Sequence, residues 1–382
     1  MRMKKVIALF RKELMLSVSL LAAAAALIIT PPTKELLSNI DWKTLATLFM
    51  MLTVLEGFKK ENIFQPVIRL SGRIGSMTGL SLFLVFGVFF SSMFVTNDVS
   101  LIIFVPLTIL LFRYGDREKF ILPVISMENI AAVRGSMLMP FGSPQNLFLF
   151  QKHEMTAGHF ILHMMPLWAF SGLLLVGYVF LLYRKEPRMR IEISDEAAGE
   201  PWKKEGKPRR ILYLVLFAVL LLTIVTRTEF WPYVTLLVTL AVLIFDRKVL
   251  LRTDYVLLLT FFCFFVFSAS ITANEAISAF LTRVVAGREY FAGILLSQVI
   301  SNVPASIVLD PFSENLAGLI YGVDSAGLCT LIGSLASVIN YRIYVREYPG
   351  QGGKFIRVFT GVSLLFFAVV VIPGLLLSRW PM

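Results

Sequence analysis

The chain has 382 residues, of which 57% are hydrophobic and only 16% are charged, and its formal net charge is +11. This balance excludes a soluble globular domain and is typical of a polytopic membrane protein. The positive charge does not indicate a nucleic-acid partner, because Lys and Arg lie mainly in loops between apolar runs, where they report orientation and contact with anionic lipid.

Apolar runs long enough to cross a hydrocarbon core of about 30 Å recur from end to end. We expect membrane-crossing helices near 14–30, 41–57, 120–147, 159–183, 211–226, 230–245, 254–271, 316–340 and 355–377. Polar residues interrupt two further apolar segments, 79–112 and 289–312. The predicted fold class is therefore an all-α polytopic membrane protein.

The first polar break is Thr96-Asn97-Asp98, inside segment 79–112. The apolar runs on either side are short, and helices there would rise only about 15 to 25 Å. They predict a re-entrant hairpin with its tip near the middle of the bilayer. An ionisable residue at this depth indicates function, so Asp98 is either a proton carrier or cation ligand, or a cap of the helix that follows.

The second break is Gly142 to Asn146, which divides the predicted helix 120–147. Arg134 precedes it and is the only basic residue outside the predicted loops. A buried guanidinium needs a partner, and three remain open: an anionic substrate, an ion pair such as one with Glu128, or the membrane interface.

A polar stretch, 184–210, divides the chain into halves 1–183 and 211–382 and is expected to be a cytoplasmic linker. With the N-terminus inside, the inner loops hold 28 of the 36 Lys and Arg residues. This asymmetry predicts a cytoplasmic N-terminus and an outer C-terminus.

The second half repeats the order of breaks. Ser301 to Pro304 interrupts segment 289–312, and Gly333 to Ser337 interrupts helix 316–340. The two halves are predicted to enter the membrane from opposite sides, as two inverted repeats, each with a re-entrant hairpin and a broken transmembrane helix. Non-helical backbone at this depth is tolerated only inside protein or beside a wet cavity, so four matched breaks indicate a site.

Such breaks present carbonyl and side-chain oxygens to a hard cation, while the next helix presents N–H groups to an anion. The sequence therefore predicts a site for a small anion and for Na⁺ or H⁺ as coupling ion, with no other cofactor. The predicted substrate-binding residues are Thr96, Asn97, Asp98, Arg134, Gly142, Ser143, Pro144, Gln145, Asn146, Ser301, Asn302, Val303, Pro304, Gly333 and Ser334. Candidate Na⁺ ligands among them are Asn97, Ser143, Asn302 and Ser334.

The four motifs "TNDVSLIIFVPLTI", "GSMLMPFGSPQNLFLF", "SNVPASIVL" and "LIGSLAS" resemble the citrate-transporter-like permeases of the ion transporter superfamily. The superfamily includes divalent-anion/sodium symporters, arsenite permeases and one class of Na⁺/H⁺ antiporters. The resemblance implies Na⁺ and substrate binding at the hairpin tips and broken-helix loops, a homodimer, and elevator-like movement. Val303 stands where the dicarboxylate branch has a hydroxyl residue, and Asp98 is more similar to the arsenite and cation-antiport branches.

We therefore expect a secondary active transporter of a small anion in the cytoplasmic membrane, such as a di- or tricarboxylate or an inorganic oxyanion. The alternative within transporters is Na⁺/H⁺ antiport or arsenite-type efflux, for which Asp98 would suffice. An enzyme is not expected, because the sequence lacks a phosphate-cradling loop, a nucleophile motif and a cysteine-based zinc pattern.

Overall fold

The computed structural model describes residues 14–30, 40–71, 74–186, 189–191, 207–380 and 382. Over these residues the fold is all-helical, apart from one isolated β-bridge between Ser76 and Arg190. The predicted inner segment 1–13 and residues 192–206 of the predicted linker lie outside the described residues.

The helices of the first half, up to the linker, are α2 (Leu14–Ile29), α4 (Trp42–Lys60), α5 (Gln65–Ser71), α6 (Met77–Val95), α7 (Asn97–Tyr114), η1 (Glu118–Phe120), α8 (Ile121–Ser136), α9 (Pro144–Lys152) and α10 (Ala157–Leu182). Those of the second half are α11 (Lys207–Val225), α12 (Trp231–Arg252), α13 (Tyr255–Thr272), α14 (Glu275–Val285), α15 (Glu289–Ile300), α16 (Asn302–Leu309), η3 (Asp310–Phe312), α17 (Leu316–Ala326), α18 (Leu335–Glu347) and α19 (Gly352–Leu377).

Six of the described helices are long and apolar enough to cross a membrane, namely α6, α7, α10, α11, α13 and α19. The prediction of an all-α polytopic membrane protein is therefore confirmed. The arms of the first hairpin are longer than expected, since α6 has 19 residues and α7 has 18. The arms of the second, α15 and α16, have only 12 and 8 residues. The re-entrant path of both hairpins stays a prediction.

The two halves show the same succession of local structures. Asp41 and Asp254 each accept a hydrogen bond from the backbone N–H three residues on, and so cap α4 and α13. In the first half, α4 is followed by the short helix α5 and then by the hairpin α6–α7. In the second half, α13 is followed by α14 and then by the hairpin α15–α16. Each half then has a pair of helices separated by a loop, and ends in a long helix, α10 or α19, of 26 residues. These parallels support the predicted repeat, while its inversion across a bilayer stays a prediction.

The predicted span 230–245 continues further than expected, because α12 extends to Arg252 across a kink at Asp246. The backbone there leaves helical geometry, with φ −158° and ψ 61°. Lys60 of α4 contacts both carboxylate oxygens of Asp246 at 2.5 and 2.6 Å, and the Tyr213 hydroxyl of α11 donates to it at 3.2 Å. This ion pair joins α4, α11 and α12 at the kink.

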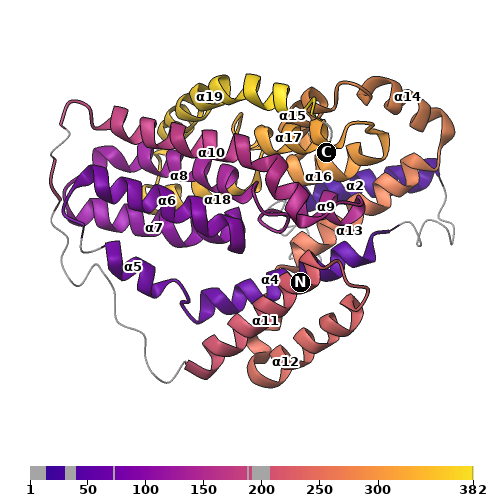
Figure 1. The fold of residues 1–382 in the computed structure, drawn as a ribbon, viewed down its shortest axis with the longest axis horizontal. Helices are drawn as coiled ribbons and strands as arrows, with labels where there is room; N and C mark the ends of the chain where they lie inside the picture. Colours follow the sequence, from indigo (N-terminus) through magenta and orange to yellow (C-terminus); the bar gives the residue numbers. More distant parts are fainter. Residues whose placement is uncertain (1–13, 31–39, 72–73, 187–188, 192–206, 381) are drawn as a thin grey trace.

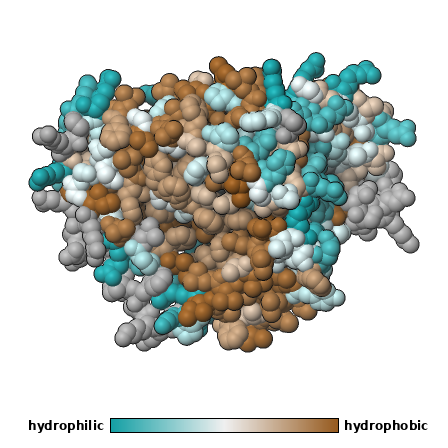
Figure 2. Space-filling model, in the orientation of Figure 1, coloured by the Kyte–Doolittle hydropathy of each residue, from teal (hydrophilic) through white to brown (hydrophobic). Residues whose placement is uncertain are grey.

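Two groups of helices can be followed in Figure 1. α4 packs against α11 and α12, and α13 packs against α2. The hairpins and broken helices form the larger group, in which α8 contacts α6, α7, α10, α18 and α19, and α17 contacts α15, α16 and α19. Apolar residues cover the middle of the face in Figure 2, and hydrophilic residues gather toward its edges, as expected for a surface that faces lipid.

Candidate functional site

Thr96 alone joins α6 to α7, so the first tip is a one-residue turn. Its φ of 70° and ψ of 157° lie outside the regions that residues other than glycine ordinarily adopt, at a cost of about 1–3 kcal/mol. The Thr96 carbonyl accepts from both the N–H and the hydroxyl of Ser100, at 3.2 and 3.0 Å. Asn97 and Asp98, predicted as part of the break, belong to the first turn of α7.

Asn97 rather than Asp98 forms the local hydrogen bond at this tip. Asn97 Oδ1 accepts from the Asp98 N–H at 3.0 Å, and the Asn97 side chain is buried. Within the described part of the chain, the Asp98 carboxylate has no hydrogen bond and no ion pair closer than 4.0 Å. Since it caps nothing, the carboxylate remains available for a ligand.

Ser301 takes the equivalent place between α15 and α16, with φ 72° and ψ 159°. Ser301 and Asn302 are both buried, and the Asn302 N–H donates to the Gly333 carbonyl at 3.2 Å. The second tip therefore touches the loop of the second broken helix. Two strained non-glycine turns with nearly equal angles, one in each half, point to a common local function.

The broken helices are interrupted by loops 137–143, between α8 and α9, and 327–334, between α17 and α18. The loops end on Ser143 and Ser334, which are both extended and both buried. Pro144 occupies the first position of α9, where its missing N–H costs no hydrogen bond. The Ser143 hydroxyl has no hydrogen-bond partner among the described residues.

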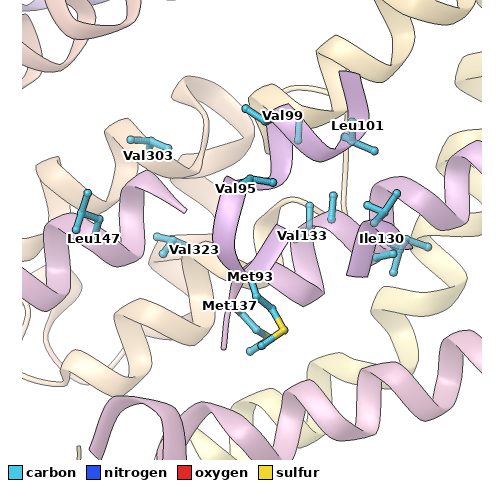
Figure 3. Close-up of a cluster of buried hydrophobic side chains, with 14 of the residues drawn as sticks. Met93, Val95, Val99, Leu101, Ile130, Val133, Met137, Leu147, Val303 and Val323 are labelled. Atoms are coloured by element: carbon cyan, nitrogen blue, oxygen red, sulfur yellow. The ribbon is translucent and has the colours of Figure 1, made fainter. Parts of the chain in front are cut away.

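Apolar side chains from both halves surround the tips and loops (Figure 3). The buried side chains labelled there come from α6, α7, α8, α9, α16, α17 and loop 137–143, and they are Met93, Val95, Val99, Leu101, Ile130, Val133, Met137, Leu147, Val303 and Val323. Among buried apolar side chains, unpaired polar groups are costly and electrostatic interactions are strong.

Gln145 and Asn146 are buried at the start of α9 and bind a residue that the sequence reading missed. Gln145 Nε2 donates to Asp324 Oδ1 and Asn146 Nδ2 donates to Asp324 Oδ2, each at 3.0 Å. Asp324 lies on α17 and is 1% exposed. An acidic residue within a predicted membrane helix was the available signal, because intramembrane carboxylates indicate function by default.

Arg134 is completely buried on α8 and donates to Ser325 Oγ of α17 at 3.2 Å. In the described structure it forms no ion pair within 4.0 Å with Asp324, the residue before Ser325. It forms no ion pair with Glu128, whose carboxylate is instead hydrogen-bonded to the hydroxyl of Thr108. The structure thus brings Arg134 to the second half of the chain and gives it a protein partner there.

Two cavities adjoin the tips, with volumes of about 480 and 500 Å³. Asp98, Asp254 and Ile339 line both, so the cavities share a wall between α7, α13 and α18. The first also reaches Thr96, Ser143 and Pro144, and the second reaches Ser301, Val303 and Pro304. The other predicted site residues do not line either cavity: Asn97, Arg134, Gly142, Gln145, Asn146, Asn302, Gly333 and Ser334.

Charged residues that the sequence reading did not single out also line these cavities. Glu56, Lys59 and Arg252 lie on the first, and Arg342 on the second. Lys59 contacts Glu56 at 3.6 Å, whereas no ion pair of Arg252 or Arg342 is found in the described part of the chain. Their positions depend on packing between helices far apart in sequence, so the spacing of residues along the chain did not predict them.

Strained tips, broken helices and cavities bounded by several apolar helices define a polytopic membrane protein with two cavities beside its tips. The model of the citrate transporter family matches residues 6–318, and the chain belongs to this family.

Two relatives match most of the chain. It is 32% identical over 315 residues to an uncharacterized transporter of Methanocaldococcus jannaschii, covering 81% of this chain and 83% of that protein. It is 31% identical over 312 residues to the inner membrane protein YbiR of Escherichia coli K12, covering 80% of each.

Among solved structures, the YdaH transporter of Alcanivorax borkumensis, described as having an unusual topology, matches with a TM-score of 0.50. It is 15% identical and the match covers 91% of this chain and 87% of that one. At this identity the likeness concerns the fold alone.

Proposed function

We propose that the protein is a secondary active transporter of a small anion, a di- or tricarboxylate or an inorganic oxyanion, coupled to Na⁺ or H⁺. The observation that carries this proposal is the arrangement of one strained tip from each half beside cavities that share a wall at Asp98 and Asp254. A site between matched halves suits alternating access, in which a binding group rocks or slides against the rest.

The charges on the cavities favour an anion that moves with a cation. Arg252 and Arg342 supply positive charge, Lys59 is paired with Glu56, and Asp98 and Asp254 supply negative charge on the shared wall. An anion attracted by the basic residues would be repelled by two bare carboxylates, so a bound Na⁺ or proton there would allow both to be accommodated. Citrate is the first substrate to test, because the family model carries that name.

A specific observation also supports the second candidate, Na⁺/H⁺ antiport or arsenite-type efflux. Arg134, the buried cation expected to meet an anion, does not line either cavity, whereas Asp98 lines both. Antiport needs only a carboxylate that binds Na⁺ and H⁺ in turn.

Counter-flow in proteoliposomes distinguishes these two candidate functions. Vesicles loaded with unlabelled anion should accumulate labelled citrate, another carboxylate, sulfate or arsenite, with a rate that depends on a Na⁺ or pH gradient. Exchange of no anion, together with proton release when Na⁺ is added, would establish antiport instead.

The proposal includes a homodimer in the cytoplasmic membrane, with the N-terminus inside, the C-terminus outside and elevator-like movement. Orientation follows from the 28 basic residues of the predicted inner loops. A single cysteine in segment 184–210 of a Cys-free variant should react with an impermeant maleimide only after the inner face is exposed. Labelling in intact cells would overturn this orientation.

A further inference from the structure

Five buried polar residues lie where α7, α8 and α18 pack against one another, and we call them the three-helix junction: Thr108, Glu128, Asn129, Ser337 and Asn340. Each has an exposed fraction of zero. Asn129 Nδ2 donates to Ser337 Oγ at 3.1 Å, and Asn340 Nδ2 donates to the Ile125 carbonyl at 2.7 Å. These bonds join a helix of the first half to one of the second.

Three oxygen atoms of the junction lack a donor. Glu128 Oε2, Asn129 Oδ1 and Asn340 Oδ1 have no hydrogen-bond partner among the described residues. The other carboxylate oxygen of Glu128 is hydrogen-bonded to the hydroxyl of Thr108. Buried acceptors without donors each cost about 1–3 kcal/mol, and an unpaired buried charge costs far more. The junction therefore needs a positive or donating species.

The protein supplies no cation for this carboxylate in the described part of the chain. Arg113 on α7 pairs with Glu347 at 3.3 Å, and Arg134 on α8 donates to Ser325. The other helices packed here carry titratable residues of their own, while α6 carries no charged residue. They are Tyr341, Arg342, Tyr344, Arg346 and Glu347 on α18, Lys354 and Arg357 on α19, and His159, His163 and Tyr178 on α10. None of them forms an ion pair or hydrogen bond with Glu128 in the described structure.

A proton fits this place better than a metal ion. None of the five junction residues lines either cavity beside the tips, and the helices here are closely packed. A Na⁺ ion with several oxygen ligands needs its own volume, whereas a proton on a carboxylate needs none. Protonation also removes the buried charge and turns the carboxyl group into a donor.

The junction is placed to affect the transport site. α7 starts at the first tip, α8 ends at loop 137–143, and α18 starts at loop 327–334. A change of charge at Glu128 therefore acts on three helices that hold three of the four polar breaks. About 16 Å of helix separates Asn97 from Thr108, the hydroxyl partner of Glu128, so this is a second site and not part of the tip.

We propose that Glu128 binds the coupling proton and that its binding and release change how α7, α8 and α18 pack, which rests on the proposed function. The proton comes from water on one side of the membrane and returns to water on the other. The only bond that forms and breaks is the O–H bond of the carboxyl group.

Infrared spectroscopy of the purified protein tests the binding site without any transport. At neutral pH the wild type should show the C=O band of a protonated carboxyl group that Glu128→Gln lacks. Glu275→Gln, the same change at an exposed position on α14, should leave this band in place. If Glu128→Gln does not fold, Thr108→Val should shift the band by removing its hydrogen-bond partner. A carboxylate that is ionised at every pH would overturn the proposal.

Transport measurements test whether Glu128 couples proton movement to anion uptake. In proteoliposomes, a pH gradient should drive anion uptake by the wild type and by Glu275→Gln, while uptake by Glu128→Gln should fall to the rate measured without a gradient. Exchange at equal pH should continue in Glu128→Gln, since the substrate cavities are unchanged. The role of Glu128 would be overturned if a pH gradient still drove anion uptake by this variant. It would also be overturned if only a Na⁺ gradient drove uptake by the wild type. Absence of any anion exchange would instead reject the proposed function.

Discussion

Gly142 and Gly333 show how tightly the two loops fold back on the helices that precede them. A Cβ atom on Gly142 would lie 2.1 Å from the Ser136 carbonyl oxygen, and one on Gly333 would lie 2.2 Å from the Ala326 carbonyl oxygen. These neighbours are backbone atoms, which cannot rotate away as a side chain would. Each loop therefore needs a residue without a side chain at this point.

Gly142→Ala should lower the free energy of unfolding by about 1–3 kcal/mol, the usual cost of forcing an extra methyl group into a packed site. Gly361→Ala is the matched control, because a Cβ atom there meets nothing within 4 Å on α19. That change should leave stability unchanged or raise it by about 1 kcal/mol, since alanine favours a helix over glycine. Thermal unfolding in detergent measures both, and equal midpoints would show that the loop relaxes without cost.

A comparison of Asp254 with Asp41 distinguishes a role in helix capping from a role in transport. Both accept from a backbone N–H at 2.9 Å, but only Asp254 lines the two cavities. Because asparagine caps as well as aspartate does, Asp41→Asn and Asp254→Asn should fold equally well. We expect Asp254→Asn alone to change the dependence of uptake on the Na⁺ or pH gradient. Identical transport by the two variants would reduce Asp254 to a cap.

The broken helices are joined across the halves by hydrogen bonds of two buried charged residues at matching positions. Arg134 is the third residue from the end of α8, and Asp324 is the third from the end of α17. Amide groups at the start of α9 hold both oxygens of Asp324, while Arg134 donates to its neighbour Ser325. These buried, charge-assisted hydrogen bonds therefore hold the two broken helices together.

Arg134→Gln and Asp324→Asn should each destabilise the protein by about 3 kcal/mol, because each leaves a buried charge with less compensation. The double variant should recover part of this loss, and a double-mutant cycle of unfolding free energies gives the coupling between them. If Arg134 instead contacts the substrate, as the sequence suggested, its variant should raise the KM for exchange while stability stays unchanged. A coupling energy near zero would mean that each residue relies on its hydrogen bonds alone.

The breaks could be predicted from the sequence because they are local: a polar triplet such as Thr96-Asn97-Asp98 within an apolar run is visible without a structure. Asp324 and Asp254 were not predicted as site residues, because the amides that bind Asp324 and the cavities that Asp254 lines are formed by segments distant in sequence. The start of α7 was misjudged, since a break of three residues was expected where one strained residue suffices.

At the scale of the whole molecule, Arg227 connects the group of α4, α11 and α12 to the hairpin and broken-helix group. Arg227, between α11 and α12, donates to the carbonyls of Gln151 and Met155 at 2.9 Å each, and its guanidinium lies 5.2 Å from the centre of the Phe150 ring. Gln151 also exchanges hydrogen bonds with Thr44 and Thr47 of α4. Carbonyls at the end of α9 attract a cation, so this contact stabilises the observed arrangement.

If transport requires one group to move against the other, a covalent link at this contact should stop it. In a Cys-free background, Arg227→Cys with Met155→Cys, joined by a bifunctional maleimide about as long as an arginine side chain, should abolish counter-flow. Cleaving the linker should restore it. The matched control is Lys43→Cys with Glu229→Cys, a nearby pair at 3.1 Å that lies within the group of α4, α11 and α12. Crosslinking this pair should leave counter-flow intact, because its two sides move together. Full transport with residues 155 and 227 crosslinked would mean that α9 does not move relative to α4. Alternating access would then arise from movement of the hairpins alone.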